Sequence, residues 1–136
     1  IKVLLKSYLN KSFKPSLVFG CGGERDKGKR KKMAIIANKY AKKVYLTDDN
    51  PRNENPNLIR KTLKKHCPKA KNISDRCLAI HTAILELKKK DILIIAGKGH
   101  EKYQIIKNKY YAFDDYQVVK NFIKLQWKLK IKYQNI

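Results

Sequence analysis

The sequence predicts an α/β fold in which a mostly parallel, Rossmann-like sheet is flanked by helices. Short apolar runs alternate with amphipathic segments along the chain, as expected when strands and helices take turns. Three of the runs, residues 16–20, 43–47 and 91–96, are apolar at nearly every central position, which is typical of strands buried on both faces of a parallel sheet. We therefore expect right-handed crossovers and the carboxyl ends of all three strands at one edge.

The helices of the first half follow from spacing and capping signals. Residues 1–9 place apolar side chains at helical intervals, and we expect the end of a helix there that begins upstream. Residues 28–42 carry a second amphipathic pattern directly after the first strand and its loop. A third helix is expected over residues 56–66, because Pro56 suits the first helical position and Asn55 can cap it.

In the second half, either Ser74 or Asp75 is expected to cap a fourth helix. After the third strand, residues 103–106 and 110–113 are two short β-like runs around Lys-Asn-Lys, which predicts a short β-hairpin near the carboxy-terminal end. The last helix is expected to begin at one of the two adjacent aspartates, Asp114 or Asp115. Its sequence becomes strongly basic beyond Trp127.

Bulk composition restricts the class of protein. The 136 residues suit one domain, and no apolar run approaches the ~20 residues of a membrane-spanning helix, so we expect no membrane partner. The three cysteines, Cys21, Cys67 and Cys77, show no C-x-x-C spacing, which argues against disulfides and a zinc site. We therefore expect a reducing, cytoplasmic location and no metal ligands.

The formal net charge is +22, from 33 Lys and Arg against 11 Asp and Glu. Such a charge can attract nucleic acid. The lysines, however, are spread over nearly every segment instead of forming one stripe, which favours a codon bias toward A and T. We therefore do not expect nucleic acid as a partner, and we keep a basic nucleic-acid-binding domain as the alternative function.

Three polar loops directly follow the three expected strands, at residues 21–28, 48–52 and 97–101. Because the strands are parallel, the loops are expected to lie on one edge of the sheet. Six of the 11 acidic residues fall in or beside them: Glu24, Asp26, Asp48, Asp49, Glu54 and Glu101. Acidic residues and arginines are both rare in this chain, so their occurrence together in these loops predicts a ligand that carries both ammonium and carboxylate groups.

Only five of the 33 basic residues are arginines: Arg25, Arg30, Arg52, Arg60 and Arg76. A guanidinium grips a carboxylate through two parallel hydrogen bonds, which an ammonium cannot do. Arg52, at the end of Asp49-Asn50-Pro51-Arg52, therefore indicates a site for an anionic group. Arg76 follows an acidic residue near a helix start, where a structural role is expected.

Each loop taken alone also has a structural explanation. The glycines of the first and third loops can serve turns that need positive φ, and Asp49 and Asn50 can close an Asx-turn before Pro51. The first loop lacks the Gly-Lys-Ser/Thr ending of a Walker phosphate loop. The three loops together favour a binding site.

Four segments resemble the carboxy-terminal domain of the Mur ligases, in that family's order and spacing. They are residues 18–30, 47–52, 75–76 and 96–101, and the resemblance extends from about Leu17 to Leu125. The segment that ends in Arg52 is similar to that of the members that add 2,6-diaminopimelate, because lysine-adding relatives do not carry this arginine. Glu24 departs from the family, which usually has Asp there.

The resemblance implies an ATP-dependent ligase that joins meso-2,6-diaminopimelate to UDP-MurNAc-L-Ala-D-Glu during the synthesis of peptidoglycan precursors. In this family ATP is cleaved to ADP and phosphate, a substrate carboxylate is phosphorylated, and the incoming amine attacks the acyl phosphate. ATP and Mg²⁺ are the implied cofactors, with sites mostly outside this chain.

The resemblance also implies which residues bind the amino acid, and no catalytic residue is expected here. Arg25 and Arg52 are expected to clamp the far carboxylate of diaminopimelate, and Glu101, Asn50 and the Gly97 carbonyl to accept its far ammonium. The expected substrate-binding residues are Arg25, Asp49, Asn50, Pro51, Arg52, Gly97 and Glu101.

Residues 1–136 are expected to form one amino-acid-binding domain that is incomplete at its amino-terminal side. The sequence lacks the start of the family's domain, where the family has a Tyr-Ala-His segment after the first strand. It also contains no UDP-binding domain and no ATP-binding domain, so the chain alone is expected to be inactive. The alternative is a non-enzymatic, basic remnant of such a domain that binds nucleic acid.

Overall fold

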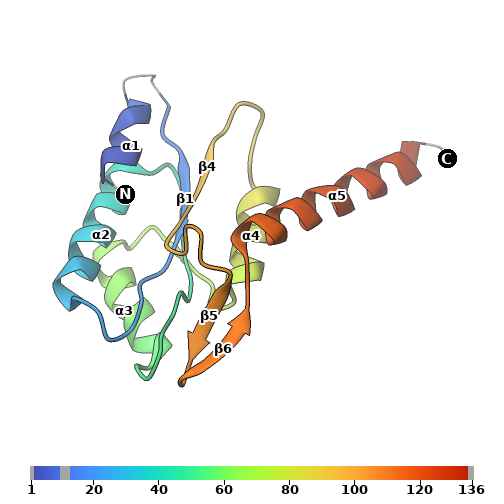
Figure 1. Ribbon diagram of the computed structural model, residues 1–136. Coiled ribbons are helices and arrows are strands. Elements are labelled where there is room, and N and C mark those ends of the chain that lie inside the picture. Colours follow the sequence, from blue (N-terminus) through green and yellow to red (C-terminus); the bar gives the residue numbers. More distant parts are fainter. Residues whose placement is uncertain (1, 10–12, 135–136) are drawn as a thin grey trace.

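The computed structural model describes residues 2–9 and 13–134 and confirms the predicted α/β class (Figure 1). Its central sheet has four strands in the order β3-β2-β1-β4, and every neighbouring pair is parallel. The strands are β1 (Ser16–Phe19), β2 (Val44–Leu46), β3 (Lys71–Asn72) and β4 (Leu93–Ala96). Leu17 of β1 is in register with Val44 on one side and with Ile94 on the other.

Five helices and a separate hairpin complete the fold of the described residues. The helices are α1 (Lys2–Leu9), α2 (Lys27–Tyr40), α3 (Pro56–His66), α4 (Arg76–Leu85) and α5 (Asp115–Gln134). The predicted hairpin is confirmed as β5 (Tyr103–Ile106) and β6 (Lys109–Ala112), which pair antiparallel. Its turn residues, Lys107 and Asn108, both have positive φ angles of 47° and 60°. Over the described residues, no helix is long and apolar enough to cross a membrane.

The alternation of side chains along β1 divides the core into two layers. Leu17 and Phe19 are fully buried with residues of α1, α2 and α3, whereas Val18, between them, is buried with Tyr45 of β2 and residues of α4. Figure 1 shows the corresponding arrangement, with α1–α3 on one side of the sheet and α4 and α5 on the other. Both faces of β1 are thus covered, which explains its unbroken apolar sequence.

Side-chain caps decide where the helices begin. Asn55 caps α3 by accepting a hydrogen bond from the amide of Asn57 at 2.9 Å, as predicted. Of the two candidates for α4, Asp75 is the cap, because its carboxylate accepts from the Leu78 amide at 2.7 Å. At the start of α5, Asp114 accepts hydrogen bonds from the amides of the first turn.

Strand β3 was not predicted from the sequence. It consists of Lys71 and Asn72, both exposed, and it pairs only with β2 at the edge of the sheet. A two-residue polar strand carries no apolar pattern, so its position depends on tertiary pairing alone. The helix predicted over residues 28–42 runs from Lys27 to Tyr40 and begins at an Asp26 cap.

Candidate functional site

The three polar loops meet at the carboxyl edge of the parallel sheet, as predicted. The first and second loops are joined directly, because the Gly23 amide donates a 2.8 Å hydrogen bond to the Asn50 carbonyl oxygen. The second and third are joined through side chains, because the Asn50 amide donates to the Glu101 carboxylate at 2.8 Å. Segments that are far apart in the sequence thus form one site.

Two glycines allow the first loop to approach the second this closely. A Cβ on Gly23 would lie 1.9 Å from the Pro51 carbonyl oxygen, and one on Gly20 would lie 2.4 Å from the Thr47 carbonyl oxygen. Neither position has room for a side chain. Gly20, directly after β1, therefore allows close backbone contact with the end of β2, and Gly23 allows it with the loop that contains Arg52.

An ion pair reinforces the contact between these two loops. The buried Arg30 guanidinium donates two 2.9 Å hydrogen bonds to Glu54 and a third, of 3.0 Å, to the Gly22 carbonyl oxygen. Glu54 also accepts from the Glu24 amide. The hydrogen bonds from Arg30, followed by that from the Glu24 amide, lower the pKa of the Glu54 carboxyl to about 2.

The five arginines separate into two groups. Arg30, Arg60 and Arg76 are buried, and each pairs with a carboxylate: Glu54, Asp48 and Asp115 respectively. The expected structural role of Arg76 is confirmed, because it binds Asp115 through Nε at 2.8 Å and Nη2 at 2.7 Å and also donates to the Ala96 carbonyl oxygen.

Arg25 and Arg52 form the second group. Neither pairs with a carboxylate among the described residues, although both lie beside acid-rich loops. They are close to each other, because a Cβ on Gly22 would lie 3.0 Å from Arg52 Nη1 and 3.5 Å from Arg25 Cγ. The guanidinium groups of Arg25 and Arg52 thus remain available to bind the carboxylate of a ligand.

The backbone and the side chain of Arg52 are both fixed. Its φ angle is 51°, and its backbone forms a parallel bridge to the hairpin, with its amide donating to Ile105 and its carbonyl accepting from Lys107. Its Nη1 donates to the carbonyl oxygens of Gly23 at 2.8 Å and Asn50 at 3.4 Å. These are its only side-chain hydrogen bonds to the described residues, which leaves Nε and Nη2 for a ligand.

A buried lysine lies beneath the site. The Lys98 ammonium donates to the Asn50 side-chain oxygen at 2.8 Å and to the Tyr103 carbonyl oxygen at 2.7 Å, and it lies 3.5 Å from an Asp49 carboxylate oxygen. Sequence reasoning missed Lys98, because a lysine between two glycines has the pattern of an exposed turn. No local signal in the sequence distinguishes it from the chain's many other lysines.

The expected role of Asn50 needs correction. Asn50 was expected to accept the far ammonium of the amino acid, but its side-chain oxygen already accepts from Lys98 and from the Ile105 amide, at 2.8 and 3.1 Å. An amide oxygen has two lone pairs, and both are used within the protein. Asn50 is instead buried and presents its NH₂ group to Glu101.

A cavity of about 470 Å³ opens between the first loop, the start of α2 and the ends of β2 and β4. Three expected site residues, Arg25, Asp49 and Gly97, line it together with Cys21. Pro51 and Arg52 line a neighbouring hollow of about 380 Å³ beside the hairpin. Five of the seven expected residues therefore line these two hollows, and Asn50 and Glu101 line neither.

Two features of this cavity affect its chemistry. Gly97 has a φ angle of +127°, and a Cβ there would lie 3.1 Å from Asp49 Oδ2, so the third loop passes close to the second. Cys21 is buried, and burial raises the pKa of its thiol to about 11. A thiolate is therefore scarce near neutral pH, and the cavity offers recognition by charge and hydrogen bonds instead of a nucleophile.

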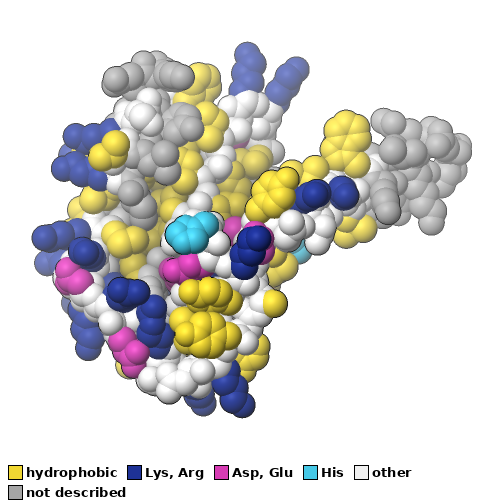
Figure 2. Space-filling view, in the orientation of Figure 1, with side chains coloured by type: hydrophobic (Ala, Val, Ile, Leu, Met, Phe, Trp, Pro, Cys, Tyr) yellow, Lys and Arg dark blue, Asp and Glu magenta, His cyan; other side chains and the backbone are white. Residues whose placement is uncertain are grey.

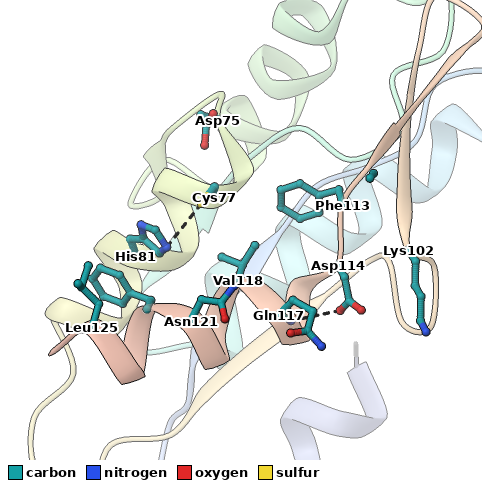
Figure 3. A pocket seen from close by; sticks show the side chains of 12 residues that line it. Asp75, Cys77, His81, Lys102, Phe113, Asp114, Gln117, Val118, Asn121 and Leu125 are labelled. Atoms are coloured by element: carbon teal, nitrogen blue, oxygen red, sulfur yellow. Dashed lines mark hydrogen bonds between the residues drawn. The ribbon is translucent and has the colours of Figure 1, made fainter. Parts of the chain in front are cut away.

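A separate groove of about 750 Å³ lies between α4 and α5 (Figure 3). Apolar side chains such as Phe113, Val118 and Leu125 line it together with polar ones such as Gln117 and Asn121. His81 stacks on Phe122 with ring centroids 3.9 Å apart, and its Nε2 lies 3.5 Å from Cys77 Sγ. None of the expected substrate-binding residues lines this groove.

The surface shows the mixture of charges that the loops predict. Figure 2 shows acidic side chains among Lys and Arg on the face that includes α2 and the hairpin. Within the part of the chain that the structure describes, no group of three or more His, Cys, Asp or Glu side chains could hold a metal ion.

Known proteins resemble this chain in sequence. A model of the family described as "Mur ligase, glutamate ligase domain" matches residues 3–99. The UDP-N-acetylmuramoyl-L-alanyl-D-glutamate–2,6-diaminopimelate ligase of Buchnera aphidicola subsp. Baizongia pistaciae is 48% identical over 122 residues, which are 88% of this chain and 24% of that protein. The ligase of the same name from Rickettsia rickettsii is 50% identical over 123 residues, which are 89% of this chain and 26% of that protein.

The fold is similar as well. A solved structure of a UDP-N-acetylmuramoyl-L-alanyl-D-glutamate–2,6-diaminopimelate ligase matches with a TM-score of 0.84 and 39% identity, over 92% of this chain and 27% of that one. The chain spans about a quarter of the length of the curated relatives it matches. The family model covers well over half of its residues. The protein therefore belongs to the Mur ligase family, and the matched residues correspond to that family's glutamate ligase domain.

Proposed function

We propose that this chain binds the incoming amino acid in an ATP-dependent ligase that adds meso-2,6-diaminopimelate to UDP-MurNAc-L-Ala-D-Glu. The names of the relatives in Buchnera and Rickettsia support the choice of reaction. We place Arg25 and Arg52 at the far carboxylate and Glu101 and the Gly97 carbonyl at the far ammonium. Asp49, Asn50 and Pro51, also expected from the sequence, would form the loop that holds Arg52 and, through Asn50, Glu101.

The observation that carries the proposal is the pair of arginines without a carboxylate partner. Every buried arginine has such a partner, whereas Arg25 and Arg52 both lie close to Gly22 and pair with no carboxylate of the described residues. Glu101 lies nearby, joined to the Arg52 loop through Asn50. Cations beside an acid suit the far end of diaminopimelate, which carries one carboxylate and one ammonium.

The same geometry favours diaminopimelate over lysine. Lysine has the far ammonium but no far carboxylate, so a bound lysine would leave the Arg52 guanidinium without its partner. Leaving such a group unpaired in a site costs roughly 2–5 kcal/mol. Arg52 would therefore determine which amino acid is added and would take no part in bond formation.

The remaining features of the proposal concern the whole ligase. Residues 1–136 would form its amino-acid-binding domain in the cytoplasm, and other domains would bind the nucleotide-linked peptide and ATP. The described residues contain no group of three or more His, Cys, Asp or Glu that could hold a metal ion, and the first loop lacks the Gly-Lys-Ser/Thr ending of a Walker phosphate loop. The role proposed for this chain is therefore the binding of the amino acid, and phosphoryl transfer would take place on the other domains.

Titration by ¹H–¹⁵N NMR tests the proposal, because it detects binding even at millimolar dissociation constants. Meso-diaminopimelate is expected to shift the amide signals of Asn50, Arg52, Gly97 and Glu101, and Arg25→Ala is expected to weaken this response. The matched control is Lys89→Ala, which removes an exposed charge before the amino end of β4, whereas the loops follow the carboxyl ends of the strands. Absence of shifts at these amides with ligand in the range of roughly tens of millimolar would contradict the proposal.

The same sample tests the rival nucleic-acid function. Neither of the two relatives reported above is named for binding nucleic acid, so no similarity supports this alternative. It predicts tight binding of a short DNA duplex that weakens steeply with salt, together with no response to diaminopimelate. Amide shifts confined to the three loops on addition of diaminopimelate would exclude it.

A further inference from the structure

Lys98 is unusual because its side chain is completely buried. It is the one buried lysine among the residues that the structure describes, and its side chain is 0% exposed. It lies in the third loop, between Gly97 and Gly99. Burying an ammonium is unfavourable unless its protons are paired, so its partners must hold it firmly.

The partners of Lys98 come from elements that the site must keep together. Its Nζ donates to Asn50 Oδ1 at 2.8 Å and to the Tyr103 carbonyl oxygen at 2.7 Å, and an oxygen of Asp49 lies 3.5 Å away. Burial lowers the pKa of Lys98, and the negative charge of Asp49 acts in the opposite direction. The ammonium thus joins the third loop to the second loop and to the hairpin.

The contact with Lys98 determines which way the Asn50 carboxamide points. An ammonium can only donate, so the carboxamide must turn its oxygen toward Lys98, where the Ile105 amide also donates to it at 3.1 Å. The NH₂ group is therefore directed to the other side. There it donates to Glu101 Oε2 at 2.8 Å.

We infer that Lys98 is a positioning residue for the amino-acid site: through Asn50, it aims the Glu101 carboxylate at the far ammonium of the substrate. Asn50 holds one Glu101 oxygen, Oε2, and Oε1 receives no hydrogen bond from the described residues. Lys98 touches no ligand in this arrangement and acts only through Asn50. The inference rests on the proposed function, because it needs a ligand with a far ammonium.

Two ligands separate this role from a general loss of structure. Meso-diaminopimelate has a far carboxylate and a far ammonium, whereas 2-aminopimelate has the carboxylate alone. Lys98→Met removes the ammonium at nearly constant volume. We expect it to weaken the binding of diaminopimelate about tenfold or more, measured by NMR titration, and that of 2-aminopimelate less than about twofold.

The matched control is Lys102→Met, the same substitution at an exposed lysine of the same loop region, which should change neither affinity. Equal losses for both ligands in Lys98→Met would overturn the inference, as would no loss for either. Absence of diaminopimelate binding in the unmodified chain would instead refute the proposed function, and the inference with it.

If Lys98→Met does not fold, Asn50→Asp tests the positioning role instead. The aspartate side chain can still accept hydrogen bonds from Lys98 and from the Ile105 amide. In place of the NH₂ group that donates to Glu101, it presents a carboxylate oxygen, which repels the Glu101 carboxylate. We expect a folded protein with the same selective loss of diaminopimelate binding. Unchanged diaminopimelate affinity in this variant would overturn the inference, because Glu101 would then need no positioning by Asn50.

Discussion

Arg52 Nη1 donates a 2.8 Å hydrogen bond to the carbonyl oxygen of Gly23, so the residue proposed to select the substrate is held by the loop opposite to it. The backbone of Arg52 is bridged to Ile106 of the hairpin at the same time. Contacts on both sides fix the guanidinium before any ligand arrives. A pre-organised cation loses little conformational entropy on binding, which favours affinity.

The close approach of the first two loops predicts that Gly23→Ala is strongly destabilising. Its Cβ would overlap the Pro51 carbonyl oxygen, which is backbone and cannot rotate away. We expect the free energy of unfolding to fall by about 3 kcal/mol, measured by urea denaturation.

Gly99→Ala provides the comparison for this prediction. Gly99 has a φ angle of +57°, but a Cβ at this position would meet nothing within 4 Å, so only backbone strain of about 1 kcal/mol is expected. A Gly23→Ala protein as stable as Gly99→Ala would show that the two loops do not touch as described.

The Arg30–Glu54 pair predicts a pH dependence of stability. The pKa of Glu54 is lowered from 4.5 to about 2 in the folded protein, so the unfolded chain binds more protons between these values. Its stabilisation is therefore complete above about pH 4.5 and is lost as pH falls toward 2.

Glu54→Gln tests this dependence. At pH 7 we expect it to lower the free energy of unfolding by about 1–3 kcal/mol, because the buried Arg30 loses its charged partner. The difference from the unmodified protein should shrink as the pH is lowered from 4.5 to about 2. A difference that stays constant over this range would mean that Glu54 is not the titrating group.

The buried Arg76 predicts that two adjacent aspartates respond differently to the same change. Asp115→Asn leaves the charge of Arg76 uncompensated, and we expect a loss of about 3–5 kcal/mol in thermal or urea unfolding. Asp114→Asn should be almost neutral, because asparagine accepts the amide hydrogen bonds of a helix start as well as aspartate does. Similar losses for both variants would contradict the assigned pairing.

Much of this fold could be predicted because its signals are local. The buried strands carry unbroken apolar runs, and Asn55 and Pro56 indicate the start of α3 by their own chemistry. The edge strand β3 has no such signal, because Lys71 and Asn72 are polar and exposed and their pairing comes from β2. Strands of this kind need the tertiary structure.

The site could be predicted in outline for the same reason. Loops that follow parallel strands must share an edge, so Arg25, Arg52 and Glu101 could be placed on one rim from the sequence alone. The role of Asn50 and the burial of Lys98 could not. Both depend on which donor meets which acceptor, and a sequence does not specify the direction in which a carboxamide points.

The affinity ratio between meso-diaminopimelate and L-lysine, compared between the unmodified chain and Arg52→Ala, tests the central claim most directly. Because an unpaired guanidinium costs at least about 2 kcal/mol, the unmodified chain is expected to prefer diaminopimelate by about 30-fold or more in NMR titrations. In Arg52→Ala the ratio should fall toward one, mainly through weaker binding of diaminopimelate. An unchanged ratio in the variant would show that Arg52 does not select the amino acid.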